Sequence, residues 1–116
     1  MASILISDPD PETRTLLELL ILRLGHRPVG PRDLASGEEL ELLLLEPASP
    51  ANLRQARALR RRLERLPIVC VSVAPQSSEA LALRPAAYVM KPFRRSELER
   101  AVTEALAPAP YLVEIA

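Results

Sequence analysis

Two short runs of almost uniformly apolar residues constrain the possible fold most strongly. Leu42–Leu45 is followed by Pro47 and Pro50, and residues 68–73 follow Pro67. A strand that is buried on both faces of a parallel sheet has such a nearly continuous apolar sequence. Leucine also favours helices, and periodicity does not separate strand from helix in so short a run. We interpret both runs as strands, because prolines close the first one and a parallel sheet needs central strands of this kind.

The composition indicates one small globular domain. The chain has 116 residues, with 15 basic and 15 acidic side chains and 48% hydrophobic residues, which argues against a disordered chain. The single cysteine, Cys70, excludes a disulfide scaffold. No apolar run approaches the ~20 residues of a membrane span, and no basic segment precedes Ile4. We therefore expect a cytoplasmic protein without membrane contact.

Helices and strands are predicted to alternate along the chain. Asp10 is a natural N-cap with Pro11 at the first helical position, and Gly25 ends that helix. Its apolar face is expected to contain Leu16, Leu17, Leu20, Ile21 and Leu24. Ser96 and Glu99 form a capping box for the last helix. The other predicted helices are residues 51–66, residues 77–83 and a piece of at most two turns around residues 36–41.

The predicted strands are residues 2–7, 27–30, 42–45, 68–73 and 87–90. Five strands that alternate with helices indicate a doubly wound α/β sandwich over residues 1–107. Residues 108–116 then form a C-terminal tail or linker. Its apolar part, from Tyr111 to Ala116, could fold back on the domain, pair with another copy or lead to an output domain, and the sequence does not decide among these.

Four polar side chains lie at the carboxyl ends of the predicted strands. Asp8 follows the first strand, Glu46 the third, Ser72 lies in the fourth, and Lys91 follows the fifth. Lys91 is the only lysine beside 14 arginines. Ligands and chemistry gather at this edge of a doubly wound sheet, so we expect these four side chains to meet there.

Four segments resemble the receiver domain of bacterial response regulators, and the resemblance spans residues 2–107. The segments are residues 4–8 (ILISD), 44–50 (LLEPASP), 67–72 (PIVCVS) and 88–93 (YVMKPF). The resemblance implies a flavodoxin-like, five-stranded parallel sheet with strand order 2-1-3-4-5, whose second helix is short here. It also implies a cis peptide bond between Lys91 and Pro92.

The resemblance also implies roles for the clustered side chains. In the family, an aspartate after the third strand accepts a phosphoryl group, and acidic residues after the first strand hold a magnesium ion. Lys91 matches the family's phosphate-contacting lysine and Ser72 its hydroxyl switch. Tyr88 matches the aromatic switch, and Asp8 matches the first acid.

Two positions depart from the family pattern. Pro9 stands where the family has a magnesium-ligating acid, and Glu46 stands at the phosphoacceptor position. Proline has no side-chain oxygen, magnesium demands near-ideal oxygen coordination, and glutamate extends into the space that a phosphoryl group needs. Asp10 is near in sequence, but as an N-cap it should face backbone amides. We expect no bound metal, no catalytic residue and no phosphorylation by the usual mechanism.

Glu46 has two possible roles beside Lys91. It could act as a built-in surrogate for the phosphorylated state, or it could form a plain structural ion pair that satisfies a buried lysine. The sequence does not decide between the two. The main alternative is a working phosphorelay receiver that uses magnesium with Glu46 or a nearby acid.

The expected function is that of an atypical receiver-like module, not an enzyme, that acts in signal transduction through protein–protein contact. The partner, or a second copy, would bind the surface formed by the fourth helix, fifth strand and fifth helix. The candidate surface residues are Arg94, Arg95, Glu97 and Arg100.

An arginine-rich helix offers a third hypothesis, nucleic-acid binding. Residues 47–66 hold six arginines and one glutamate. The block has no aromatic residue for stacking, and the preceding block is acidic, so a solvated helix face is the favoured interpretation. The six arginines are Arg54, Arg57, Arg60, Arg61, Arg62 and Arg65.

Overall fold

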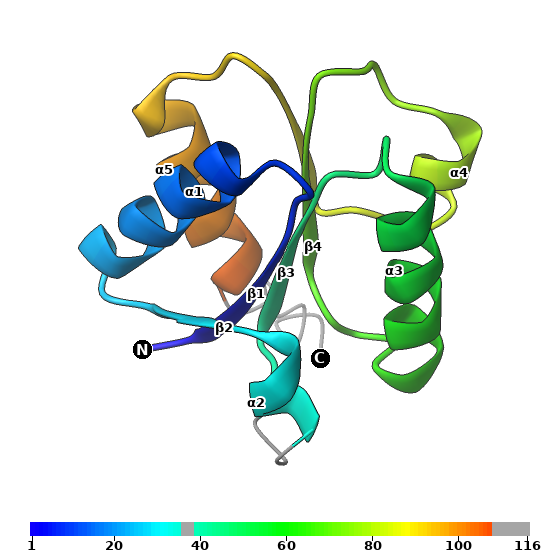
Figure 1. The fold of residues 1–116 in the computed structure, drawn as a ribbon, viewed down its shortest axis with the longest axis horizontal. Coiled ribbons are helices and arrows are strands. Elements are labelled where there is room, and N and C mark those ends of the chain that lie inside the picture. The colour runs from blue at the N-terminus through cyan, green and yellow to red at the C-terminus, as the bar shows by residue number, and fades with distance from the viewer. Residues whose placement is uncertain (36–38, 108–116) are drawn as a thin grey trace, which may run out of the picture.

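A computed structural model describes residues 1–35 and 39–107 (Figure 1). The elements, in chain order, are β1 (Ser3–Ser7), α1 (Pro11–Arg23), β2 (Arg27–Val29), α2 (Pro31–Ala35), β3 (Leu42–Leu45), α3 (Pro50–Arg62), β4 (Ile68–Ser72), α4 (Ser78–Leu81), β5 (Ala87–Met90) and α5 (Arg95–Leu106). The predicted tail, residues 108–116, lies outside the described residues.

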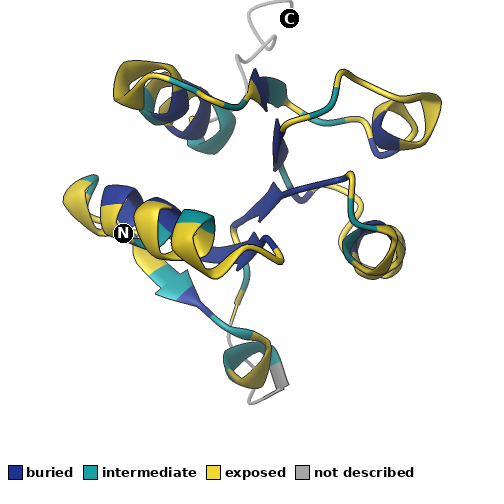
Figure 2. Cartoon of the chain, turned by 45° about the horizontal axis from the view of Figure 1, so that its top comes forward, coloured by how far each residue is buried: buried dark blue, intermediate teal, exposed yellow. Residues whose placement is uncertain are grey.

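The five strands form one parallel sheet in the order β2-β1-β3-β4-β5, which confirms the predicted topology. Helices α1 and α5 cover one face, and α3 and α4 cover the other (Figure 1). The central strands are buried and the outer sides of the helices are exposed (Figure 2). The carboxyl ends of all five strands therefore meet at one edge of the sheet.

The two apolar runs are strands because they pack on both faces. In β3, Leu42 and Leu44 belong to the core beneath α1 and α5, whereas Leu43 and Leu45 belong to the core beneath α3. Strand β4 alternates in the same way. Each apolar residue of these strands thus meets apolar neighbours on its own face of the sheet, which explains why apolar and polar residues do not alternate along the runs.

Helix α1 begins as predicted, but its inner face is narrower. The carboxylate of Asp10 accepts a hydrogen bond from the Thr13 amide, and Gly25 follows the helix with a φ of +87°. Leu17, Leu20 and Ile21 are buried. Leu16, which was expected on the apolar face, is 48% exposed. The prediction was wrong there because an apolar residue next to a buried one need not share its face of the helix.

The prediction of a helix around residues 36–41 was wrong for residues 39–41, the part of this segment that the structure describes. The second helix lies earlier, at Pro31–Ala35, and residues 39–41 are not helical. The Asp33 carboxylate accepts a hydrogen bond from the Gly30 amide at 2.7 Å and so stabilises the helix start. Residues 36–38 lie outside the described residues.

Two helix ends also differ from the prediction. Helix α3 ends at Arg62, not at residue 66, because Arg60 donates hydrogen bonds to the carbonyls of Glu64 and Leu66 in the turn that follows. Helix α5 begins after Arg94, whose amide donates to the carboxylate of Glu97 at 2.8 Å. The predicted Ser96–Glu99 capping box is therefore not formed.

The arginine-rich helix is partly engaged within the protein. Arg57 forms an ion pair with Glu79 at 2.8 Å, and Arg60 also donates to the carbonyl of Leu83. The buried side of α3 consists of Leu53, Ala56 and Leu59. Two of the six arginines are thus engaged within the protein, and the other four are exposed.

The two-sided core makes the first prediction. Replacement of the fully buried Leu44 by alanine should lower the free energy of unfolding by about 3 kcal/mol, because it leaves a cavity in the central strand. Leu81→Ala, at a position that is 52% exposed, should change it by less than about 0.5 kcal/mol. Urea denaturation followed by circular dichroism measures both, and equal losses would contradict the packing described.

Candidate functional site

The four polar side chains predicted to meet at the carboxyl edge of the sheet do meet there. Asp8, Glu46 and Ser72 are buried. Lys91 follows β5, and its side chain is only 14% exposed. Its backbone amide donates to the carbonyl of Ser72 at 2.7 Å, which fixes the turn against the end of β4. The Lys91–Pro92 peptide bond is cis, as predicted.

The ammonium group of Lys91 bridges two carboxylates. Its Nζ atom lies 2.7 Å from Oδ2 of Asp8 and 3.1 Å from Oε1 of Glu46. The other Asp8 oxygen accepts a hydrogen bond from the Asp10 amide at 2.9 Å. The other Glu46 oxygen accepts one from the Ala48 amide at 3.1 Å. Each of the four carboxylate oxygens thus has a donor.

The electrostatics of this cluster favour the charged forms. Burial alone would raise the pKa of Glu46, but hydrogen bonds from Ser72, Ala48 and Lys91 lower it below its usual value. Burial alone would lower the pKa of Lys91, but hydrogen bonds and the charges of Asp8 and Glu46 raise it. The cluster is therefore a closed ion network with one cation and two anions.

Ser72 and Tyr88 meet at one residue of the loop after β4. The Ser72 hydroxyl accepts a hydrogen bond from the Ala74 amide at 3.1 Å, and the Tyr88 hydroxyl donates to the Ala74 carbonyl at 2.7 Å. Ser72 also stabilises the Glu46 carboxylate. A chain of contacts thus runs from the ion network through Ser72 and Ala74 to Tyr88.

The residues after β1 offer few free oxygen ligands to a magnesium ion. Asp8 already binds Lys91, and Pro9 has no side-chain oxygen. Asp10 faces the first turn of α1, where hydrogen bonds from Thr13 lower the pKa of its carboxyl group. Among residues 1–35 and 39–107, no group of three or more His, Cys, Asp or Glu side chains is arranged to hold a metal.

Three supporting residues were not predicted from the sequence. On α3, the Asn52 side-chain amide donates to the Ser7 carbonyl at 3.1 Å, and the Gln55 side-chain carbonyl accepts from the Ser7 hydroxyl at 3.2 Å. The guanidinium of Arg14 donates to the Asp8 carbonyl at 2.9 Å. All three line a pocket of about 460 Å³ beside Asp8. The only sequence signal was the polar pair Asn52 and Gln55, one turn apart in an arginine-rich helix.

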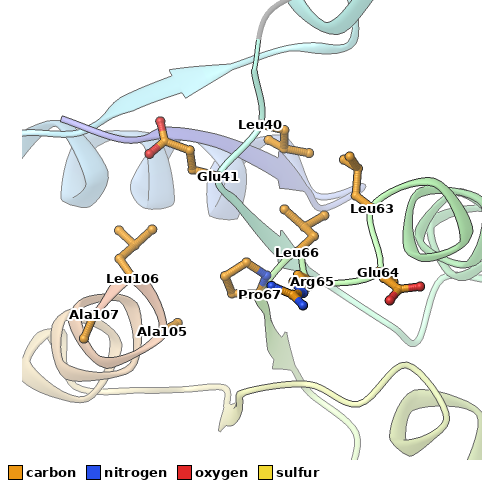
Figure 3. Close-up of a pocket in the computed structure, with 10 residues that line it drawn as sticks. All are labelled: Leu40, Glu41, Leu63, Glu64, Arg65, Leu66, Pro67, Ala105, Leu106 and Ala107. Atoms are coloured by element: carbon orange, nitrogen blue, oxygen red, sulfur yellow. The ribbon is translucent and has the colours of Figure 1, made fainter. Parts of the chain in front are cut away.

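A larger pocket, of about 540 Å³, lies at the opposite end of the sheet (Figure 3). It is bounded by residues that precede β3 and β4 and by the end of α5, with Leu66 and Leu106 among them. Its two carboxylates, Glu41 and Glu64, lie on opposite sides (Figure 3). Since these polar groups do not converge, this pocket is not the chemical site.

The histidine and the cysteine are structural. His26 accepts a hydrogen bond from the Ala2 amide through Nδ1 at 3.0 Å. Cys70 is a buried free thiol, and burial, with the nearby charge of Glu46, raises its pKa to about 11. A thiol with so high a pKa is a poor nucleophile.

The part of the chain that the structure describes has no helix with the length and apolar character needed to cross a membrane. The sequence matches no family model and no curated protein. The comparison with solved structures, however, finds close likeness over nearly the whole chain.

Three solved structures illustrate the likeness. The response regulator TrrA from Thermotoga maritima, in complex with Mg²⁺-BeF, is 23% identical with a TM-score of 0.77, covering 91% of this chain and 100% of that chain. The receiver domain of sensor histidine kinase PA1611 from Pseudomonas aeruginosa, with magnesium in its active-site cleft, is 22% identical with a TM-score of 0.74, covering 90% and 97%. Another response regulator from Thermotoga maritima is 14% identical with a TM-score of 0.78, covering 93% and 99%.

At such low sequence identity, the structural likeness establishes the fold only. The function has to be argued from the residues of the site. The sequence-based resemblance is confirmed at that level. The chain has the flavodoxin-like fold of response-regulator receiver domains.

Proposed function

We propose that this chain is a pseudo-receiver, a signalling module that binds a protein partner and is not switched by phosphorylation. The observation that carries the proposal is the bridge from Lys91 to both Asp8 and Glu46. In a working receiver, the lysine contacts the phosphoryl oxygens. Here a carboxylate of the chain itself takes that contact.

The same geometry disfavours phosphoryl transfer. Transfer depends on a positioned nucleophile and on a metal that neutralises the phosphoryl oxygens. Glu46 accepts from Lys91, Ala48 and Val73, so its oxygens already point at donors rather than at open space. Pro9 removes a metal ligand, and Asp8 is engaged with Lys91.

Glu46 holds the site in one state. Through Ser72, its carboxylate connects to the loop at Ala74, where Tyr88 also binds. In the family, the hydroxyl and aromatic residues move when the phosphoryl group arrives. Because the Glu46 carboxylate always lies beside Lys91, Ser72 and Tyr88 keep one fixed arrangement.

The proposed partner surface comprises α4, β5 and α5. Leu81 on α4 and Met90 on β5 are 52% and 43% exposed, and the start of α5 carries a mixed-charge set. That set is Arg94, Arg95, Glu97 and Arg100, all exposed. Exposed apolar side chains together with charged ones are typical of protein-binding surfaces.

The cytoplasmic location expected from the sequence stays a prediction.

The ion network makes a prediction about stability. Lys91→Met leaves two buried carboxylates without a counter-charge and should lower the free energy of unfolding at pH 7 by about 3–5 kcal/mol. Lys91→Met combined with Glu46→Gln should recover more than half of that loss. Urea denaturation of both variants at pH 7 is the measurement.

The pH dependence provides the control. The folded pKa of Glu46 is below its unfolded value of 4.5, so its stabilisation is present above pH 4.5 and is lost as the pH falls through the folded pKa. The difference between wild type and Lys91→Met should therefore shrink at acid pH. The raised pKa of Lys91 makes its contribution present below 10.5 and lost in strong alkali. A cost of Lys91→Met that is small at pH 7, or constant with pH, would contradict the network.

Phosphorylation tests the proposed function itself. Incubation with acetyl phosphate and Mg²⁺, followed at once by intact-mass measurement, should show no added phosphoryl group on the wild-type chain. The double variant Pro9→Asp/Glu46→Asp restores both missing groups and should gain one phosphoryl mass. Pro9→Asp/Glu46→Asn is the matched control and should gain none. A stoichiometric gain on the wild type would support a working phosphoacceptor instead.

A further inference from the structure

Helix α1 is apolar on two opposite sides. Its inner side buries Leu17, Leu20 and Ile21 against the sheet. Its outer side carries Leu16, Leu19 and Leu22, which are 48%, 55% and 55% exposed. Because these three leucines are spaced by three residues and are all exposed, they lie next to each other along the solvent side of α1. A helix with apolar residues all round is normally covered on all sides.

The other long helices show that this stripe is specific to α1. The exposed side of α3 carries Arg54, Arg57 and Arg61, and the exposed side of α5 carries Arg100 and Glu104. The chain thus places charged residues on the outer surface of two helices and leucines on that of the third. Composition alone does not explain the leucine stripe.

The ends of the stripe carry opposite charges. Glu12 in the first turn and Arg23 in the last turn are both exposed. They are eleven positions apart, about three turns at 3.6 residues per turn, so both lie on the same outer side as Leu19. An antiparallel second copy of α1 places Glu12 of each copy near Arg23 of the other. A parallel copy would place like charges together.

We propose that a second copy of this chain covers the leucine stripe, with the two α1 helices antiparallel about a two-fold axis between Leu16 and Leu19. The interface is isologous, since each copy contributes the same residues. The leucines supply the apolar contact, and the exposed ion pairs set the orientation more than the affinity. The stripe shares no residue with the α4, β5 and α5 surface, so the dimer is independent of the proposed partner binding.

The size of the stripe sets the expected strength. Three half-exposed leucines with flanking charges form a contact smaller than a standard interface of about 1,600 Å². We therefore expect a reversible dimer with a dissociation constant in the micromolar range. Its population should rise with protein concentration.

Sedimentation velocity of the full chain over a concentration series tests the proposal. Leu19→Glu should weaken self-association by at least about tenfold, because it places two like charges close together beside the two-fold axis. The matched control is Leu81→Glu, at an equally exposed leucine on α4, and it should leave the dissociation constant unchanged. Circular dichroism confirms that both variants are folded.

Charge exchange gives a second, independent test. Glu12→Arg should weaken the dimer about threefold, because it meets Arg23 of the other copy. Adding Arg23→Glu to the same chain should restore the wild-type constant. If Glu12→Arg weakened the dimer only by disturbing helix α1, adding Arg23→Glu would not restore the dissociation constant.

Three outcomes would overturn the proposal. The first is a monomer at every concentration. The second is a dimer that Leu81→Glu disrupts and Leu19→Glu does not, which would place self-association on α4. The third is a dimer that forms only after removal of residues 108–116, which would identify the chain's own apolar tail as the cover of the stripe.

Discussion

One ammonium group between two buried carboxylates holds the carboxyl edge of the sheet together. Lys91 contacts Asp8 across 83 positions of sequence and Glu46 across 45. Asp8 and Glu46 are 4% and 5% exposed, so neither charge is well solvated without Lys91. The network joins the ends of β1, β3 and β5, and the strand order brings these ends to one edge.

The chemistry of the side chains suits this arrangement. Lysine carries a compact ammonium on a flexible stem, whereas arginine presents a rigid planar fork. A single Nζ atom can donate to two carboxylates that approach from different strands. This explains why the only lysine in an arginine-rich chain lies here.

Much of the fold could be predicted because the apolar runs and the strand order do not depend on where each helix begins and ends. The runs at Leu42–Leu45 and in β4 indicate strands buried on both faces, and the sheet order followed from the resemblance of four short segments. The meeting of Asp8, Glu46, Ser72 and Lys91 was also predictable, because parallel strands bring their carboxyl ends together. These features depend on topology and not on exact helix ends.

The features that could not be predicted depend on which of two similar residues caps a helix, or on the course of the loops that follow the strands. Glu97 and Glu99 both lie near the start of α5, and only the structure shows that Glu97 binds the Arg94 amide. The donors to Glu46 from Ala48 and Val73 are backbone amides, which carry no residue-type signal. Leu16 fits the helical spacing predicted for the inner face of α1, but it lies on the outer side, where it forms part of the leucine stripe.

The fold of a receiver domain thus persists here with a different arrangement of charges at its site. The sheet and both cores are built from apolar packing that does not involve Asp8, Glu46 or Lys91. The site can therefore change its chemistry while the fold is kept. In the function we propose, Glu46 and Pro9 stand in place of a reactive carboxylate and a metal ligand, and Glu46 forms an ion network with Lys91 and Asp8.

A crystal structure of the protein grown with magnesium and beryllofluoride tests this account most directly. The account predicts that Lys91 Nζ still bridges Asp8 and Glu46, with neither magnesium nor beryllofluoride bound at the carboxyl edge of the sheet. Beryllofluoride attached to Glu46, with a magnesium ion beside Asp8 and Lys91 moved onto the fluorides, would contradict it.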